Sequence, residues 1–596
     1  MSTGGTMSTG GTMSSGGTMS TGGTTTGGTG GSPACDPGVA TPCYDGPDAT
    51  MGVGLCKGGM HTCLPDGTGY GPCEGEVLPK AEDCATPEDD DCDGASNNGC
   101  ACVPGSLASC YDGPAGTAGV GLCKTGNHTC AADGQGYGPC NGQVLPLLET
   151  CATGGDDDCD GTDACTNVAV WAKLFDGAVK AIRVAPLGED ILVAGDFQGT
   201  IDLGGGPFVG NMFDTDVFVA RFDKNGNHVW SKAIIAPQNQ YVRALAAGPG
   251  GALTLAGDYL GTPDFGFGPL PSPVNTATYV VRLSTTDGAP VWSKSFSSAF
   301  GMLTADAAMD ASGNTLVGGR FGGQLTLDGV PYSNAGMFDG YVYKLSPNGT
   351  VLWSRVYGTT DSEGVRAVGF DPSGNAFVTG TVYATSIDLG GGPLPSQGGS
   401  DDVFLAKYGP SGAFLWGQRF LGAGNQTPLD LSVDGAGNVA VVGILEGTMS
   451  LGGGVSLSKP VGTGGFFIVL GDAGQAKGAI PLTGNLQSML TGVAPTGTSF
   501  GVIGYFNGDA TFSVANVQSM AFTPDVFVAQ IPAVGAPPFG ARFGGMGTDY
   551  GEGIAYDSAL APLLWGQSDL PIDFGNGVTI TPQVTQKFLL KTAPLP

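Results

Sequence analysis

The chain has 596 residues, of which 108 are glycine and 40 are proline, and 23 basic against 53 acidic residues give it a formal net charge of −30. This composition is typical of many short strands joined by turns. The charge argues against nucleic acid as a partner, because no Lys/Arg cluster offers a footprint for a polyanion. No run approaches the roughly 18 apolar residues of a transmembrane segment, so none is expected.

Residues 1–33 repeat a short Met/Ser/Thr-Gly-Gly-Thr unit. Nothing in this segment can bury an apolar core, so we predict a disordered, low-complexity tether. The tether is similar to the spacers that follow the lipidated cysteine of bacterial surface lipoproteins. Met1 is not followed by the basic and apolar regions of a signal peptide. Because the cysteines described next indicate export, we expect the export signal to be missing from the recorded N-terminus.

Residues 34–166 contain all sixteen cysteines, arranged as two copies of one eight-cysteine pattern. We therefore predict two small modules, 34–100 and 101–166. Each has few aliphatic residues, so we expect four disulfides per module and an oxidising compartment; zinc is disfavoured because no C-x-x-C pair occurs. The pairing itself stays open at this point. The predicted disulfide cysteines are Cys35, Cys43, Cys56, Cys63, Cys73, Cys84, Cys92, Cys100, Cys102, Cys110, Cys123, Cys130, Cys140, Cys151, Cys159 and Cys165.

Each module ends in an acidic loop that is a candidate metal site. Hard carboxylate oxygens in a short loop suit Ca²⁺, and no other metal or cofactor is expected. The alternative is a solvated acidic loop between disulfides. The candidate ligands are Asp89, Asp90, Asp91, Asp93, Asp156, Asp157, Asp158 and Asp160.

Residues 167–596 contain no cysteine and follow a fixed period. A short polar residue recurs in the same Gly-rich context every 61 or 62 residues, most clearly in Gly199 to Pro207 and Thr385 to Pro393. Asp, Ser and Thr interchange at this position, so we expect a side chain that holds a turn rather than a catalytic group. The seven positions are Asp202, Asp264, Thr326, Asp388, Ser450, Thr511 and Asp573.

Two hairpins fill each period. In the clearest copy, Val365 to Phe370 turns at D-P-S-G-N into Ala376 to Thr381, and a second hairpin ends on Trp416. Four antiparallel strands repeated seven times predict an all-β fold, a seven-bladed β-propeller of four-stranded blades. The last unit stops after its third strand, so we predict that residues 168–175, with Trp171 in the repeated Trp position, complete it and close the ring.

The repeat resembles the bacterial seven-bladed propeller repeat (SBBP-type) of exported and surface proteins. The resemblance rests on the D-P-S-G-N-A-F-V-T-G block at Asp371, on its relatives at Asp310 and Asp434, and on F-G-G-M-G-T-D-Y-G-E-G at Phe543. It covers about residues 168–596 and implies the fold, without a shared catalytic set. The acidic ends of the cysteine modules are similar to a metal-binding motif of bacterial surface proteins.

The sequence shows no Ser/His/Asp or Cys/His set, and its arginines look too few and too scattered to clamp an acidic sugar. The loops that precede the first strands, with Asp361, Glu363, Asp549 and Glu552, could gather on one face and bind a cation or a glycan. We predict a monomeric, non-enzymatic cell-surface or secreted protein that presents the propeller as a binding or scaffold domain for a protein or glycan ligand. The alternative is a polysaccharide hydrolase or lyase that uses Asp/Glu.

Overall fold

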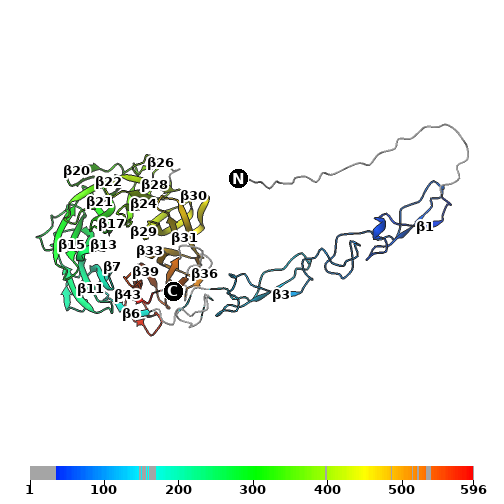
Figure 1. The fold of residues 1–596 in the computed structure, drawn as a ribbon, viewed down its shortest axis with the longest axis horizontal. Coiled ribbons are helices and arrows are strands. Elements are labelled where there is room, and N and C mark those ends of the chain that lie inside the picture. The colour runs from blue at the N-terminus through cyan, green and yellow to red at the C-terminus, as the bar shows by residue number, and fades with distance from the viewer. Residues whose placement is uncertain are drawn as a thin grey trace, which may run out of the picture. The chain divides into compact units, whose positions relative to one another are not determined.

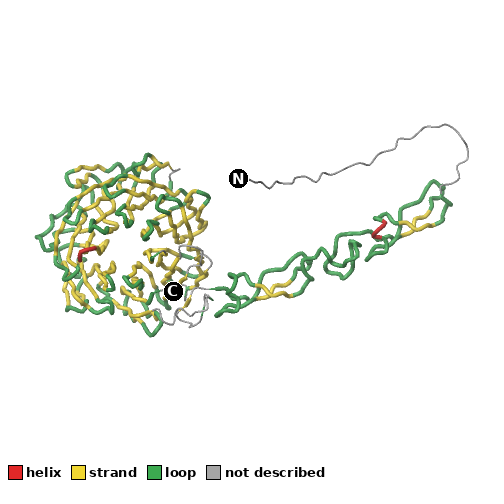
Figure 2. Tube along the Cα trace, viewed as in Figure 1, coloured by secondary structure: helices red, strands yellow, loops and turns green. Residues whose placement is uncertain are grey.

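A computed structural model describes residues 35–146, 149–150, 156, 159, 169–395, 399–484, 486–497, 499–512, 515–519, 523–531 and 539–594. Nearly all of the regular structure is strand; the described residues add two single-turn 3-10 helices, η1 (Asp48–Thr50) and η3 (Pro249–Gly251). Figures 1 and 2 show a ring of small sheets and, separately, the cysteine-rich modules. We describe these two parts in turn.

The ring consists of seven blades, each built on four antiparallel strands, which confirms the predicted propeller. Two of the sheets are longer: the hairpin of β35 (Asp509–Phe512) and β36 (Ala515–Gln518) extends the sheet of blade 5, and β5 (Glu149–Thr150) adds in parallel to the outer strand of blade 6. Blade 1 is β7 (Val179–Leu187), β8 (Asp190–Phe197), β11 (Asp216–Phe222) and β12 (His228–Ile234). Blade 2 is β13 (Gln240–Gly248), β14 (Ala252–Tyr259), β15 (Ala277–Ser284) and β16 (Pro290–Phe296). Blade 3 is β17 (Met302–Met309), β18 (Thr315–Phe321), β21 (Asp339–Leu345) and β22 (Val351–Tyr357).

The other blades repeat this order. Blade 4 is β23 (Glu363–Phe370), β24 (Ala376–Val382), β27 (Asp402–Tyr408) and β28 (Phe414–Phe420). Blade 5 is β29 (Gln426–Val433), β30 (Val439–Gly452), β31 (Val455–Leu470) and β32 (Ala476–Gly484). Blade 6 is β33 (Ser488–Thr496), β34 (Ser499–Phe506), β37 (Asp525–Ile531) and β38 (Phe539–Phe543). Blade 7 is β39 (Asp549–Tyr556), β40 (Pro562–Ser568), β43 (Gln586–Thr592) and β6 (Ala169–Leu174).

Blade 7 takes its fourth strand from the start of the domain, as predicted. β6 pairs antiparallel with β43, and Leu174 lies opposite Phe588. The pairing joins residues more than 400 positions apart in the chain. Because β6 covers β43, the sheet edge that β43 would otherwise leave open is removed. The predicted closing strand over residues 168–175 is thus confirmed, and the structure gives it the bounds Ala169–Leu174.

The two faces of the ring follow from the alternation of strand direction. The tight turns between first and second and between third and fourth strands lie on one face, which we call the turn face. The longer connections, from second to third strand and from each blade to the next, lie on the opposite face, which we call the loop face. Short hairpins occupy the loop face: β9 (Thr200–Asp202) with β10 (Pro207–Val209), β19 (Gln324–Leu327) with β20 (Val330–Ser333), β25 (Ser386–Asp388) with β26 (Pro393–Pro395), β35 (Asp509–Phe512) with β36 (Ala515–Gln518), and β41 (Ile572–Asp573) with β42 (Thr579–Ile580).

The repeated polar residue begins the turn of these hairpins. At Asp202 and Asp388 its carboxylate accepts backbone hydrogen bonds within the turn, which is a structural role. Asp202 Oδ1 accepts hydrogen bonds from the N–H groups of Gly204 (2.8 Å) and Gly206 (3.2 Å), and Asp388 accepts the same pair from Gly390 and Gly392. Gly204 and Gly206 have φ values of 107° and 103°, a conformation that favours glycine. The Gly-rich sequence and its Asp therefore encode one turn.

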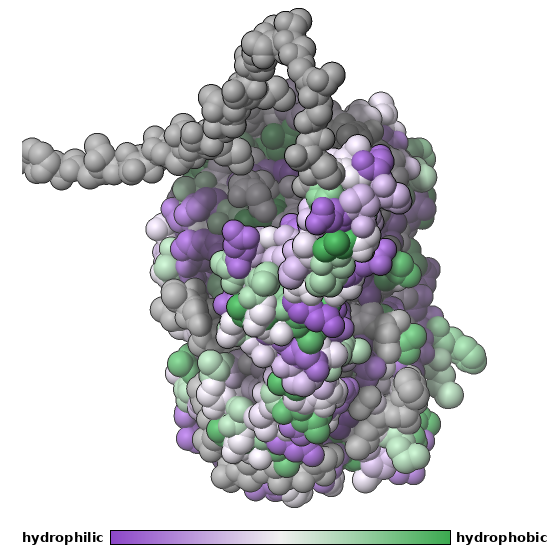
Figure 3. Space-filling model, turned by 90° about the vertical axis from the view of Figure 1, so that its right-hand side faces the viewer, coloured by the Kyte–Doolittle hydropathy of each residue, from purple (hydrophilic) through white to green (hydrophobic). Residues whose placement is uncertain are grey.

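Apolar side chains pack between blades. The structure contains an apolar cluster at each of the seven junctions between neighbouring blades, including the junction of blade 7 with blade 1, where Leu563 and Leu589 pack with Phe197 and Phe222. Each sheet is therefore buried on both faces by its neighbours. In Figure 3, hydrophilic and hydrophobic side chains are intermingled in small groups over the described residues of the visible face.

Tryptophans link consecutive blades on the turn face. Each repeated Trp lies on a fourth strand, and its indole N–H donates to a carbonyl in the third-to-fourth turn of the next blade. The bonds run from Trp171 to Lys224 O (3.0 Å), Trp230 to Thr285 O (3.0 Å), Trp292 to Pro347 O (2.7 Å), Trp353 to Pro410 O (3.1 Å) and Trp416 to Asp472 O (2.8 Å). The Trp171 bond crosses the closure of the ring.

The cysteine modules have the same pairing pattern in both copies. The first module contains β1 (Ala40–Cys43) and β2 (Gly59–Thr62), and the second contains β3 (Leu107–Cys110) and β4 (Gly126–Thr129); β5 (Glu149–Thr150) follows. The disulfides are Cys35–Cys63, Cys43–Cys73, Cys56–Cys92 and Cys84–Cys100, then Cys102–Cys130, Cys110–Cys140 and Cys123–Cys159. Cys151 and Cys165 lie outside the described residues, and the module limits 34–100 and 101–166 stay predictions.

We predict that Trp353→Phe lowers the free energy of unfolding of the propeller by about 1 kcal/mol, because it removes one solvent-accessible hydrogen bond but keeps most of the aromatic packing. Urea unfolding, followed by the fluorescence of the remaining tryptophans, measures the change. Leu352→Ala is the control, since Leu352 is 50% exposed and its removal should change stability by no more than about 0.5 kcal/mol. Equal stability of Trp353→Phe and the wild type would contradict the role of the indole N–H.

Candidate functional site

The first strand of every blade is interrupted by a β-bulge near its start. In blades 2–7 the bulge falls at the equivalent residue, which is left without a partner in the strand pairing and points its side chain away from the regular ladder. These six residues are Arg243, Ala305, Arg366, Leu429, Thr491 and Glu552, and all of them line the centre of the ring. In blade 1 the unpaired residue is Lys180, and Arg183 lines the centre instead.

The centre of the ring holds a cavity of about 560 Å³, which we call the channel cavity. Residues from the first strands of all seven blades line it. Several of its charged groups have partners within the ring: Lys587 pairs with Glu552 and donates to Gln567 Oε1 (2.9 Å), and Arg183 donates to the carbonyls of Arg243 (2.8 Å) and Ile182 (2.9 Å). Arg366 also lines the channel cavity.

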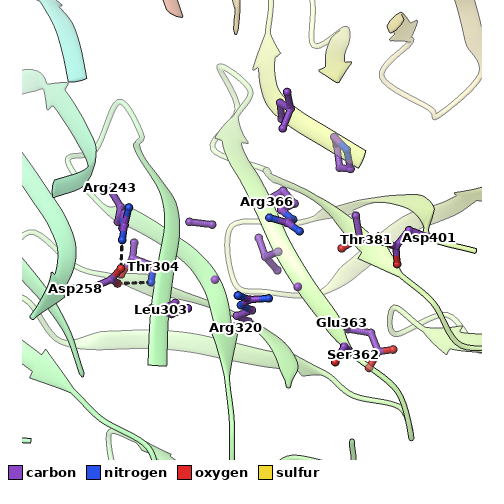
Figure 4. A pocket seen from close by; sticks show the side chains of 16 residues that line it. Arg243, Asp258, Leu303, Thr304, Arg320, Ser362, Glu363, Arg366, Thr381 and Asp401 are labelled. Carbon is purple, nitrogen blue, oxygen red and sulfur yellow. Dashed lines mark hydrogen bonds and ion pairs between the residues drawn. The ribbon is translucent and has the colours of Figure 1, made fainter. Parts of the chain in front are cut away.

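A second cavity, of about 460 Å³, adjoins the channel cavity, and we call it the mouth cavity. The two share Arg243, Ala305, Arg366 and Leu429 among their lining residues. The mouth cavity is lined mainly by the beginnings of the first strands of blades 2–5 and the ends of the second strands of blades 2–4, and these are the strand ends at the loop face. Figure 4 shows its labelled side chains, including three arginines and three acidic residues.

The arginines of the mouth cavity are Arg243, Arg320 and Arg366. Arg243 donates to Asp258 Oδ2 (2.7 Å), whereas the guanidinium groups of Arg320 and Arg366 have no hydrogen bond or ion pair with any residue that the structure describes. Both side chains are exposed to the cavity, and the Arg320 guanidinium lies over the ring of Phe338, 5.1 Å from its centroid. Figure 4 shows them on neighbouring strands, β18 and β23.

Arg320 and Arg366 repel each other. The walls of the cavity displace water from the Arg366 guanidinium and lower its pKa, and the positive charge of Arg320 lowers that pKa further, while Asp401 raises it. Arginine stays protonated despite such shifts, because its pKa in water is above about 12. Two neighbouring cations without a hydrogen-bonded counter-ion are an electrostatic feature that an anion would stabilise.

The acidic residues of the mouth cavity are Asp258, Glu363 and Asp401. Asp258 accepts from Thr304 N–H (2.7 Å) as well as from Arg243, and Glu363 accepts from the N–H (2.8 Å) and hydroxyl (2.5 Å) of Thr359. Burial raises the pKa of Glu363 and of Asp401, and the nearby Arg366 opposes the shift at Asp401. Ser362 and Thr381 add hydroxyl groups to the same lining.

Carboxylates on the second strands of blades 1 and 2 and on the first strands of blades 3 and 5 also connect adjacent blades around the centre. Each accepts a backbone N–H from the next blade: Asp196 from Val242, Asp258 from Thr304 (2.7 Å), Asp306 from Val368 (2.9 Å) and Asp430 from Val493 (2.8 Å). Burial raises the pKa of Asp196 to about 7, of Asp306 to about 6 and of Asp430 to about 7. These residues hold blades together, so their shifted pKa values have a structural cause.

The arginines, which look scattered in the sequence, are brought together in part by the fold. Four of the nine arginines in the chain, Arg183, Arg243, Arg320 and Arg366, line two adjoining cavities. Three of them occur in the repeated frame I-R-V or V-R-A at the equivalent place in a first strand. The recurrence of this frame is the sequence signal that could have identified these arginines as a group. Of the predicted acidic residues, Glu363 reaches the mouth cavity and Glu552 the channel cavity.

The acidic loop of the first cysteine module brings together only part of the predicted metal set. Carboxylate oxygens of Glu82, Asp89 and Asp91 lie within 4.8 Å of one another. Asp90 instead pairs with Lys80 (3.1 Å), and the hydrogen bond from Lys80 lowers the pKa of Asp90. Asp93 accepts hydrogen bonds from Ala95 N–H (2.9 Å) and from the side-chain amide of Asn98. Asp157, Asp158 and Asp160 lie outside the described residues. Ca²⁺ binding stays a prediction, which in this module rests on Glu82, Asp89 and Asp91.

No known family model and no curated protein matches the chain. Solved structures that resemble the ring include BamB from Moraxella catarrhalis (10% identity, 71% of this chain, 100% of that chain, TM-score 0.34) and the Pan2 WD40 domain of Neurospora crassa (9%, 72%, 96%, 0.36). Another is the polysaccharide lyase Uly1 (11%, 70%, 90%, 0.37). We draw no functional argument from likenesses this low. No helix among the described residues is long and apolar enough to cross a membrane.

We predict that Asp196→Asn changes the pH dependence of stability. The pKa of Asp196 is about 7 in the folded protein against an ordinary value of 3.8, so protonation stabilises the fold below about pH 4 and this contribution is lost as the pH rises through 7. Asn keeps the acceptor for Val242 N–H but does not titrate.

The unfolding free energy of the wild type, relative to Asp196→Asn, should therefore fall between pH 4 and 7, by at most ~1.4 kcal/mol per pH unit. Urea titrations of both proteins at several pH values measure the difference. Parallel stability curves would show that Asp196 titrates near its ordinary value.

Proposed function

We propose that this protein is an exported, non-enzymatic binding protein, and that the propeller binds its ligand at the loop face while the cysteine modules serve as a stalk at the cell surface. The observation that carries the proposal is the mouth cavity. It is open to solvent and contains two arginines, Arg320 and Arg366, that have no hydrogen-bond or ion-pair partner among the described residues. Buried or clustered charges without partners cost free energy, so they are typical of binding sites.

Exposed apolar side chains on the loop face are available for contact with a ligand. Several large apolar side chains in the connections of this face are at least 70% exposed. They belong to second-to-third connections or to connections between blades, so they lie on the loop face with the mouth cavity. They are Met212, Phe213, Val274, Phe300, Met337 and Met546.

The disulfides support the proposed location. Seven bridges are formed among the described residues, and small modules stapled in this way belong to oxidising compartments. Membership of the SBBP-type repeat family, the surface location, the tether over residues 1–33 and the monomeric state are parts of the same proposal.

The alternative of an Asp/Glu hydrolase or lyase has less support. A glycosidase needs two carboxyl groups free to act as acid and as base or nucleophile. In the mouth cavity, Asp258 and Glu363 are held by hydrogen bonds from Arg243, Thr304 and Thr359, and only Asp401 is left to the cavity without such a bond among the described side chains. Binding without turnover is therefore the better-supported function.

A polysaccharide and protein array probed with the full chain tests this proposal. We expect retention of at least one ligand, without release of reducing ends or unsaturated sugars from any retained polysaccharide. Product formation would show that the protein is an enzyme, and absence of retention across the array would count against a binding protein of this kind.

We also predict that reduction affects the two parts of the chain differently. Dithiothreitol should unfold the cysteine modules but leave the thermal transition of the propeller unchanged, because residues 167–596 contain no cysteine. Circular dichroism on heating, with and without the reductant, measures both transitions. The unreduced protein from its native host should contain no free thiol. Sixteen free thiols in that protein would contradict export.

A further inference from the structure

We infer that the mouth cavity binds the carboxylate of an acidic sugar, so that the ligand of the propeller is a uronate-containing glycan. This inference deepens the proposed function and rests on it. The guanidinium groups of Arg320 and Arg366 would hold the carboxylate, and the hydroxyl and carboxyl groups around them would bind the sugar ring.

The charges of the mouth cavity favour an anionic ligand. The chain carries a net charge of −30, yet the mouth cavity contains three arginines from three consecutive blades. Arg243 already donates to Asp258, whereas Arg320 and Arg366 line the same cavity without a hydrogen-bonded counter-ion among the described residues. A ligand that brings a negative charge between them replaces a repulsion with two attractions, and this gain does not depend on any change in the fold.

The geometry of a guanidinium group favours a carboxylate as this anion. Arginine presents parallel N–H groups that match the two oxygens of a carboxylate, and such bidentate pairs are shorter and stronger than ordinary hydrogen bonds. Arg320 comes from the second strand of blade 3 and Arg366 from the bulge in the first strand of blade 4, so the rigid sheets hold both groups in place. Figure 4 shows both side chains among the residues that line the cavity.

The carboxyl groups of the mouth cavity favour an acidic sugar over a bare anion such as sulfate. Three carboxyl groups line the same cavity, and Asp401 accepts no hydrogen bond from any described side chain. A small polyanion that filled the cavity would meet this negative charge. A sugar instead carries hydroxyl groups that can donate to Asp401 and exchange hydrogen bonds with Ser362 and Thr381.

The polar lining of the mouth cavity favours a glycan over an acidic peptide. The residues that line the cavity are mostly polar or glycine, and Gly319 and Gly364 leave its wall without side chains there. Such a lining offers hydrogen bonds to a hydroxylated ring, whereas the neighbours of a peptide carboxylate would need apolar pockets. The exposed apolar residues of the loop face lie on loop tips and not in the cavity.

Binding of oligogalacturonate, of alginate oligomers and of oligoglucuronate to the full chain tests the inference, with the methyl ester of each oligomer as a probe that keeps the ring and hydroxyls but lacks the charge. We expect at least one uronate to bind and its ester to bind at least tenfold more weakly. Arg320→Ala and Arg366→Ala should each weaken binding at least tenfold, and the double variant should abolish it.

Two further variants sharpen the result. Arg366→Lys keeps the charge but not the paired N–H groups, so it should bind more weakly than the wild type and more tightly than Arg366→Ala. Lys232→Ala removes the same charge from an exposed position on the fourth strand of blade 1, away from both cavities, and should bind as the wild type does. The thermal transition of each variant shows that the propeller is folded.

Three results would overturn the inference: equal binding of an oligomer and its ester, unchanged binding by the arginine variants, or binding of polyglutamate or inorganic sulfate as tight as that of the uronates. Failure of every uronate, with a neutral glycan or a protein retained on the array, would also overturn it but would leave the proposed binding function in place.

Discussion

The blades of this protein have no cores of their own. Their apolar side chains meet at the junctions between sheets, so each sheet is stable only while both of its neighbours are present. A row of such sheets would leave two unburied faces and two sheet edges, and the ring removes them by the pairing of β6 with β43. That single pairing completes the last blade and gives the cluster between blades 7 and 1 its second half. The other repeated contacts act on this closed ring.

Two kinds of polar contact then fix each blade against the next at different radii. On the turn face, the indole N–H groups reach carbonyls in the neighbouring turn, as Trp292 does with Pro347. Near the centre, buried carboxylates accept backbone N–H groups next to the bulges, as Asp430 does with Val493. The carboxylates satisfy these N–H groups and hold one blade against the next, which gives the strongly shifted acids near the cavity a structural role.

The sequence was sufficient to predict the fold, because its signals are local and repeated. The Asp202 turn, the Trp hairpins and the missing fourth strand each follow from spacing alone, and the structure confirms them. The pairing of the cysteines could not be predicted, since it depends on how loops meet in space. The mouth cavity was missed for the same reason: Arg320 and Arg366 are 46 residues apart on different blades, and only the ring geometry brings them to one cavity.

The bulged position has a consequence for how such a ring can change its specificity. In blades 2–7 this position holds Arg, Ala, Arg, Leu, Thr and Glu, and none of these residues takes part in the strand pairing. Substitution there alters what the cavity presents and leaves the residues of the strand pairing and of the tryptophan bonds unchanged, although Thr491 also donates to Gly551 O of the next blade (2.8 Å). Recognition and folding are thereby encoded by different residues of the same repeat. A duplicated unit can diverge at one site per copy and acquire a new ligand while the architecture stays constant.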